Sequence, residues 1–142
     1  MKPQELRIGN LVCYNGEVVK VKQITKHKIG YHTKPYEMGM NYARLCEIEP
    51  IPITEELLRM NGFSEIQKES HGEHCGLVWY EYRKEIEGVI IDIDIKYKQP
   101  HEYFKVHIYN ETLNTIKKHE LYVHDLQNAY QLVTKEELTL QL

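Results

Sequence analysis

The chain has 142 residues, of which 42% are hydrophobic and 27% are charged, and its formal net charge is −3. These proportions are typical of a folded globular domain and exclude a disordered chain, which combines few hydrophobic residues with a high net charge. The slightly acidic balance excludes a global positive field, so nucleic-acid binding would need a local basic patch. The sequence shows neither a secretory signal nor a stretch long and apolar enough to span a membrane, and we expect a soluble cytoplasmic protein.

Three cysteines are present, at Cys13, Cys46 and Cys75, and no two of them form a Cys-x-x-Cys pair. An odd number without paired spacing argues against a disulfide framework, so we expect reduced thiols. Tyrosine is frequent, with 11 residues against two Phe and one Trp, and it favours β-strands. The composition therefore indicates a small protein with substantial strand content.

The N-terminal part of the chain predicts a small β-structure. A strand over residues 6–14 ends at Asn15-Gly16, the dipeptide best suited to a hairpin turn with two positive φ angles. The pattern after this turn predicts three more strands, over residues 17–24, 28–32 and 43–48. Short strands of this kind curl to remove their edges, and we expect an SH3-like or KOW-like sheet.

A proline-rich connector follows at residues 49–53, because its two prolines are incompatible with a central strand. Thr54 offers its hydroxyl as the N-cap of a short helix, and Asn61-Gly62 ends that helix. The connector is therefore the predicted boundary between two parts of the chain.

The second part predicts an antiparallel sheet and a long helix. Residues 64–76 are polar and contain glycine, so we expect a loop there. Three strands joined by short turns are predicted, over residues 77–83, 89–97 and 103–109. Apolar residues at spacings of three and four predict a helix over residues 122–134, with His124 and Gln127 on its exposed face. The alternation over residues 137–142 is compatible with a terminal strand.

Together these elements predict an α+β fold. An N-terminal SH3-like small β-barrel or bent sheet is followed by an antiparallel sheet that the C-terminal helix covers. The predicted parts, which we expect to form one compact unit, are an SH3-like β subdomain over residues 1–49 and an α+β subdomain over residues 50–142.

Three segments of the chain resemble one family of small proteins. The segments are Arg7-Ile8-Gly9-Asn10-Leu11-Val12 with the Asn15-Gly16 turn, Pro52-Ile53-Thr54-Glu55-Glu56-Leu57-Leu58 with Asn61-Gly62-Phe63, and Tyr122-Val123-His124-Asp125-Leu126-Gln127-Asn128-Ala129-Tyr130 with Glu136-Glu137-Leu138. They look like the uncharacterised small proteins carried by phages, prophages and mobile elements of gut Bacteroidetes. The resemblance implies an accessory role, for example next to DNA metabolism, and it implies no catalytic residues.

A basic and aromatic cluster in the N-terminal third is the first candidate site. Its residues are Lys20, Lys22, Lys26, Lys28, Lys34 and Arg44, interleaved with Tyr31, Tyr36 and Tyr42. Basic side chains on a small barrel can hold the backbone of a single-stranded nucleic acid while aromatic rings stack on its bases. A solvated lysine face that discourages edge pairing explains the same residues, and this alternative stays open.

A second candidate site is a possible metal centre at His71, His74 and Cys75, which are suitable ligands for zinc. No second Cys or His pair completes the ligand set, so a polar loop that contains histidines remains the alternative. Asp92 and Asp94 share the predicted wet face of one strand, as a metal-dependent hydrolase or nuclease would require. The solvent face of an amphipathic strand explains the same alternation.

The sequence contains no recognisable catalytic motif, and we expect no cofactor. The prediction is a non-enzymatic accessory protein that acts as a protein- or nucleic-acid-binding module and does not bind membranes. Two alternatives stay open, namely a small metal-dependent hydrolase or nuclease and a structural component of an oligomer. The oligomeric state itself is not predicted.

Overall fold

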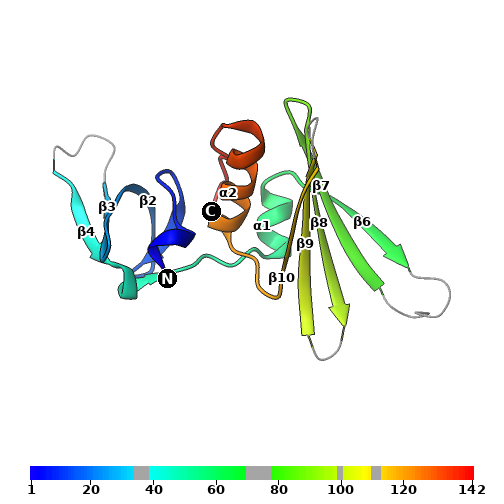
Figure 1. Ribbon diagram of the computed structural model, residues 1–142. Coiled ribbons are helices and arrows are strands. Elements are labelled where there is room, and N and C mark those ends of the chain that lie inside the picture. The colour runs from blue at the N-terminus through cyan, green and yellow to red at the C-terminus, as the bar shows by residue number, and fades with distance from the viewer. Residues whose placement is uncertain (34–38, 70–77, 99–100, 110–112) are drawn as a thin grey trace.

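The computed structural model describes residues 1–33, 39–69, 78–98, 101–109 and 113–142. It contains two five-stranded antiparallel sheets, and helix α2 (Val123–Thr134) lies between them (Figure 1). The first sheet comes from the N-terminal part of the chain, and the second sheet follows the connector. None of the helices in these described ranges is long and apolar enough to cross a membrane.

The first sheet has the strand order β4-β3-β2-β1-β5, so that β5 returns to pair with β1. Its strands are β1 (Leu11–Tyr14), β2 (Glu17–Ile24), β3 (Lys28–Tyr31), β4 (Asn41–Arg44) and β5 (Ile48–Glu49). The turns η1 (Pro3–Glu5) and η2 (Leu45–Glu47) precede β1 and β5. The φ angles of Asn15 and Gly16 are 51° and 79°, which confirms the predicted hairpin turn.

A β-bulge between Val21 and Gln23 bends β2, and the first sheet curls into a half-barrel. Apolar side chains from each of its strands point inward and fill it. The buried residues of this first core are Leu6, Val12, Val19, Val21, Ile29, Tyr31, Ala43, Leu45 and Ile48. The predicted curled N-terminal sheet is therefore confirmed.

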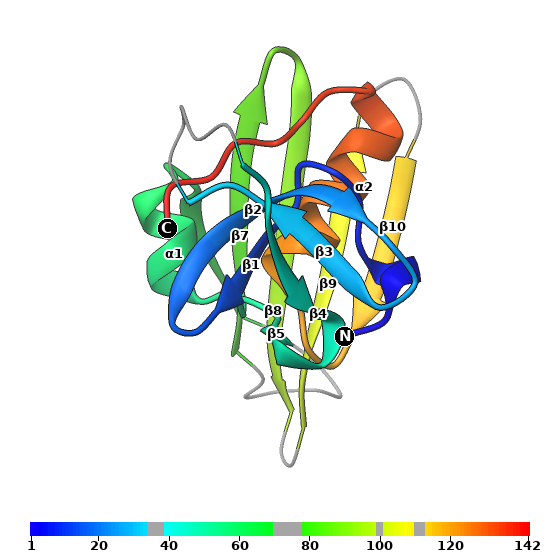
Figure 2. The same cartoon turned by 90° about the vertical axis from the view of Figure 1, so that its left-hand side faces the viewer.

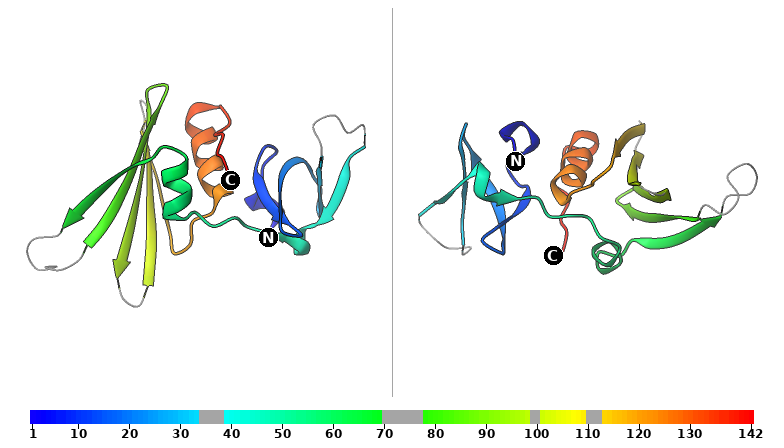
Figure 3. Two further views of the ribbon diagram at one scale, coloured as in Figure 1. Left: turned by 180° about the vertical axis from the view of Figure 1, so that it is seen from behind. Right: turned by 90° about the horizontal axis from the view of Figure 1, so that it is seen from below.

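The second sheet is a meander with the strand order β10-β9-β8-β7-β6. Its strands are β6 (Ser64–Glu69), β7 (Val78–Ile86), β8 (Val89–Lys98), β9 (His101–Tyr109) and β10 (Leu113–Lys118). Seen from below, the strands trace an arc, and both helices lie on the same side of it (Figure 3). The other side of the sheet, which we call the open face, carries no helix of the described ranges.

The helix-covered face of the second sheet carries the second core. Apolar and polar residues alternate along β8, and this alternation buries Val89, Ile91, Ile93 and Ile95 on this face, as the sequence predicts. Helix α1 (Glu55–Met60) begins at the predicted N-cap Thr54, whose Oγ1 accepts the N–H of Leu57 at 3.1 Å. The sheet, α1 and α2 together confirm the predicted α+β class.

Polar contacts connect α2 to the first sheet, and we call this contact region the seam. The buried Gln127 accepts the backbone N–H of Leu11 through Oε1 at 2.9 Å and donates through Nε2 to the carbonyl of Leu138 at 3.2 Å. Asn128 accepts a hydrogen bond from the Asn10 side chain at 3.0 Å and donates one to the carbonyl of Glu5 at 2.9 Å. The seam therefore joins residues more than a hundred positions apart in the sequence.

The C-terminal segment differs from the sequence prediction. Residues 137–142 form no strand and run from the end of α2 across to α1 (Figure 2). Asn61 fixes the segment there, because its Oδ1 accepts the N–H of Gln141 at 2.7 Å and its Nδ2 donates to the carbonyl of Gln141 at 2.8 Å. The alternating apolar residues Leu138 and Leu140 are buried in the second core without strand pairing.

Three further predictions about local structure are wrong. The polar loop predicted from residue 64 begins instead with β6, an edge strand with a single apolar residue, Ile66. His124 and Gln127, predicted on the exposed face of the last helix, are 3% and 7% exposed because that face packs in the seam. The strand predicted over residues 43–48 is interrupted by η2, where the chain turns from β4 into β5.

Candidate nucleic-acid interface

The basic residues predicted from the sequence lie on the half-barrel. Those on the described part of the chain are all exposed, namely Lys20, Lys22, Lys26, Lys28 and Arg44. Lys34 and Tyr36 lie outside the described residues. Residues 1–49 hold eight Lys and Arg against five Asp and Glu, whereas residues 50–142 hold ten against sixteen. Positive charge is therefore concentrated on the half-barrel of a protein that is acidic overall.

Tyr31 does not lie on the exposed surface. Its side chain is 7% exposed and belongs to the first core, where its ring centroid is 5.6 Å from that of Tyr14. The alternation of β3 explains this position, because Ile29 and Tyr31 point to one face of the strand and Lys28 and Gly30 to the other. Tyr31 therefore stabilises the half-barrel and offers no ring to a ligand, which corrects the sequence-based site.

Tyr42, another tyrosine of the predicted cluster, does have an exposed ring. It lies on β4 directly opposite Gly30 of β3, and Gly30 lies opposite Gln23 of β2. The Tyr42 hydroxyl nevertheless donates to Gln23 Oε1 at 3.2 Å, so the ring crosses β3 where that strand has no side chain. Gly30 is buried as a result, whereas Tyr42 itself remains 53% exposed.

Space above Gly30 is tightly filled. A Cβ atom at this position would lie 2.3 Å from Sδ of Met40 and 3.1 Å from Cβ of Gln23. Glycine is therefore required for the close approach of these side chains to β3. The result is an apolar platform on the outer face of the half-barrel, formed by Tyr42 and Met40.

Two cations flank this platform. Lys28 and Arg44 lie directly opposite each other on β3 and β4, two residues along from the Gly30 and Tyr42 pair. Like charges directly opposite each other destabilise a sheet. Within the described ranges neither side chain has an ion pair, and the Glu47 carboxylate accepts the backbone N–H of Arg44 at 3.0 Å. Both charges are therefore available to a ligand.

We call the exposed group Lys22, Lys26, Lys28, Tyr42 and Arg44 the basic face. Its strands β3 and β4 lie at the side of the molecule farthest from the second sheet (Figure 1), and they face the viewer in Figure 2. A cationic surface around an exposed ring can hold phosphates by charge and a base by stacking. The register of β3 and β4 thus places Lys28, Tyr42 and Arg44 on one face of the sheet.

Lys20 does not belong to the basic face. Its Nζ lies 2.6 Å from Oε2 of Glu137 in the C-terminal segment. Lys20 pairs with Leu11 of β1, which packs against the second core, so this part of β2 faces α2 and the C-terminal segment. The structure therefore separates Lys20 from the other predicted basic residues.

The carboxylates considered for metal chemistry lie on the open face of the second sheet. Asp92 is 4% exposed, and Arg83 on β7 donates to both of its oxygens, at 2.7 and 3.0 Å. The same guanidinium lies 3.2 Å from Oε1 of the buried Glu81. The predicted wet face of β8 is therefore partly buried, and Asp92 is occupied by an arginine where a metal site would need free oxygens.

Neighbouring groups on the open face shift the pKa values of Arg83 and His107. The hydrogen bond and charge of Asp92 raise the pKa of Arg83 above its ordinary value. Burial, followed by the charge of Lys105, lowers the pKa of His107. The His107 ring also contacts Thr115 Oγ1 at 3.1 Å through Nδ1 and stacks on Tyr109. Cross-strand partners thus hold these polar groups in place.

The sequence-predicted metal ligands His71, His74 and Cys75 lie outside the described residues. Among the residues that the structure does describe, no group of three or more His, Cys, Asp or Glu side chains is arranged to hold a metal ion. The zinc hypothesis for His71, His74 and Cys75 stays a prediction.

Comparisons with known proteins do not supply a family for this chain. No protein-family model, no curated protein and no solved structure matches it.

Proposed function

We propose that the protein is a non-enzymatic module that binds single-stranded nucleic acid through the basic face. The observation that carries the proposal is the Tyr42 ring, which lies across Gly30 with 53% of its surface exposed beside the opposed cations Lys28 and Arg44. Such a module would suit the accessory role in phages or mobile elements that the sequence resemblance implies.

The chemistry of the basic face favours single strands over duplexes. A base stacks on an aromatic ring only when its own face is open, which requires an unpaired strand. Each neutralised phosphate releases a counterion, so binding would weaken as salt increases. Charge and stacking act on any base, and we therefore expect little sequence preference.

The test is fluorescence anisotropy with labelled oligothymidine and oligouridine of about 12 nucleotides, a length within the usual site size of small barrels. We expect saturable binding that weakens between about 50 and 200 mM salt. Tyr42→Ala should weaken binding by about 1 to 3 kcal/mol, the usual contribution of one stacked base. Lys28→Ala together with Arg44→Ala should weaken binding and also reduce its salt dependence.

Two control variants separate stacking and local charge from general effects. Tyr42→Phe keeps the ring and should retain most of the affinity, while Lys117→Ala removes an exposed lysine from the second sheet and should leave binding unchanged. The proposal is wrong if the wild-type protein shows no binding at low salt, or if Lys117→Ala weakens binding as much as Lys28→Ala together with Arg44→Ala does.

The alternatives from the sequence gain less support. The hydrolase or nuclease hypothesis needs Asp92 and Asp94 to coordinate a metal ion. Both carboxylate oxygens of Asp92, however, accept hydrogen bonds from Arg83. The hypothesis of a structural oligomer would need an extended apolar surface. Apart from Met40 and Tyr42 of the platform, the exposed large apolar side chains, such as Ile8 on the N-terminal segment and Met60 on α1, come from separate elements.

A further inference from the structure

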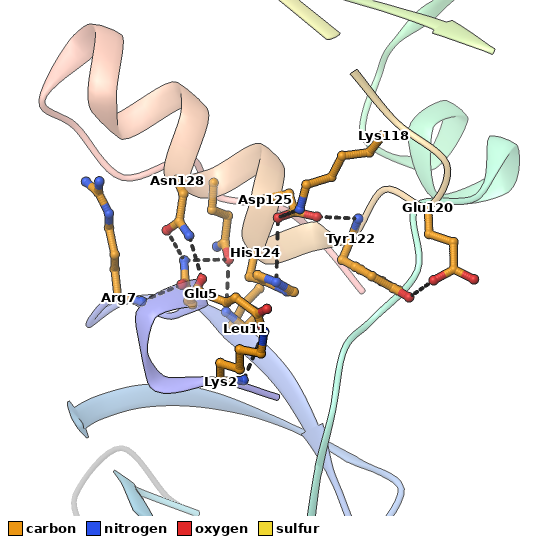
Figure 4. Close-up of polar contacts among 12 residues, drawn as sticks. Lys2, Glu5, Arg7, Leu11, Lys118, Glu120, Tyr122, His124, Asp125 and Asn128 are labelled. Atoms are coloured by element: carbon orange, nitrogen blue, oxygen red, sulfur yellow. Dashed lines mark hydrogen bonds and ion pairs between the residues drawn. The ribbon is translucent and has the colours of Figure 1, made fainter. Parts of the chain in front are cut away.

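His124 is a buried imidazole in the seam. It lies in the first turn of α2, its side chain points toward the first sheet (Figure 4), and it is 3% exposed. Its ring stacks on Tyr122, with ring centroids 5.7 Å apart and an interplanar angle of 7°. A residue in this position can change the contact between the two sheets if its charge changes.

The hydrogen bonds of His124 are incomplete. Its Nδ1 is buried and has no hydrogen-bond partner among the described residues. Its Nε2 lies 3.7 Å from Oδ1 of Asp125, which is too long for a hydrogen bond. Protonation would place a second N–H donor on a ring that already lacks partners, and burying such a charged donor is unfavourable.

The charged groups around His124 offer little compensation. Asp125 carries a negative charge, but its carboxylate also binds the ammonium of Lys118 at 2.5 Å and accepts the N–H of Tyr122 at 3.2 Å (Figure 4). Glu5 and the N-terminal ammonium act on His124 from the first sheet with opposite signs. The N-terminal end of α2 also carries a partial positive charge, which disfavours an imidazolium there.

We infer that the seam is a pH-sensitive junction, in which protonation of His124 opens the contact between α2 and the first sheet. Opening the seam would let the imidazolium reach water while each sheet keeps its own core. The junction would thus change how the half-barrel is held against the second sheet without unfolding either of them.

The direction of the pH effect follows from the difference in the pKa of His124 between the closed and the open seam. Burial lowers the pKa of His124 from its ordinary value of 6.5 in the closed seam. The open state therefore binds the proton more strongly than the closed state, so the closed seam keeps its full stability above pH 6.5 and loses it as the pH falls. The loss amounts to about tenfold in the closing equilibrium for each pH unit below that value, until the pKa in the closed seam is reached.

Hydrogen exchange measured by NMR at about pH 7.5 and about pH 5 tests this inference. The backbone N–H of Leu11 reports the seam, because it donates to Gln127. We expect its protection, corrected for the intrinsic pH dependence of exchange, to fall at the lower pH. The amides of β8 and β9 should keep their protection, and His124→Phe, which keeps a stacking ring without a titrating group, should remove the pH difference at Leu11.

Two controls make the outcome decisive. His107→Gln removes another histidine with a lowered pKa, on the open face of the second sheet, and should leave the pH dependence at Leu11 intact. In the wild-type protein, the His124 ring should titrate below pH 6.5, which remains measurable if His124→Phe does not fold. Constant protection of Leu11, an equal loss in β8 and β9, or titration of His124 at or above 6.5 would overturn the inference.

Discussion

At the residue scale, we expect the ion pair of Asp92 with Arg83 to contribute to stability. Asp92→Asn removes the negative charge that accepts two hydrogen bonds from Arg83 in a side chain that is only 6% exposed. We expect a loss of about 1 to 3 kcal/mol in the free energy of unfolding, since hydrogen bonds to charged groups contribute about this much. Arg83 is 48% exposed and can be solvated, which keeps the loss below that of a fully buried pair.

Urea denaturation at neutral pH measures this loss. Asp94→Asn is the matched control, because Asp94 lies on the same face of β8 two residues away and is less buried than Asp92. The Asp94 variant should lose clearly less stability. Equal losses in the two variants would contradict the structural role of the Arg83 pair.

The same residues show what a sequence can and cannot predict. The alternation along β8 correctly places Asp92 and Asp94 on the face opposite Ile91 and Ile93. It does not show that Asp92 is buried, because its burial depends on Arg83, which pairs across from β7. Tyr31 and Tyr42 are a second example. Successive residues of a strand point to opposite faces, so a shift of one residue along the strand decides whether a tyrosine ring enters the core.

At the element scale, β3 acts as the support of the exposed ring, and Gly30 is the position that permits it. Gly30→Ala would place a Cβ against Met40 Sδ and Gln23 Cβ, so the side chains above β3 must shift. Met40 is flexible and partly exposed, and we therefore expect a loss of stability below about 1.5 kcal/mol. The substitution should displace the Tyr42 platform. We therefore expect the free energy of nucleic-acid binding to fall by more than the free energy of unfolding.

Anisotropy and thermal melting of the same samples separate the two effects. Gly16→Ala provides the comparison, since Gly16 has φ of 79° and a Cβ there would meet nothing within 4 Å, so that its backbone strain affects stability alone. If Gly30→Ala binds as tightly as the wild-type protein, Tyr42 does not contact the ligand in this position.

Elements with strong local signals could be predicted from the sequence. The Asn15-Gly16 turn, the strand of residues 17–24 and the N-cap at Thr54 agree with the structure, because each depends on neighbouring residues. Strand β6 could not be predicted, since its polar sequence is suited to a strand only beside β7. The terminal segment shows the opposite case, because its alternation is real but no strand of the described residues pairs with it.

At the scale of the whole molecule, we expect the seam to determine whether the two sheets unfold together. The chain has two separate apolar cores, one in each sheet. The sequence predicts a boundary at the proline-rich connector but not the contact across it, because His124 and Gln127 have the composition of an exposed helix face. Buried polar residues of this kind can be identified only when their partners, such as Leu11 and Asn10, are known.

Gln127→Ala tests the joining role of the seam. The substitution leaves the part-buried N–H of Leu11 and the carbonyl of Leu138 without their partner, at a cost of up to about 1 to 3 kcal/mol for each group. We expect the wild-type protein to unfold in one cooperative transition and the variant to show two, because the two cores are then less strongly coupled. Trp79 fluorescence follows the second sheet, and NMR signals of β2 follow the first.

The control for this experiment is Gln131→Ala, one turn further along α2. Its side chain makes no hydrogen bond to the first sheet among the described residues, so a single transition should remain. Two transitions in the Gln127 variant with one in the Gln131 variant would show that a single buried amide couples two cores that are far apart in the sequence. Coincident transitions in both variants would instead assign the coupling to apolar contacts around Leu11, which packs against the second core.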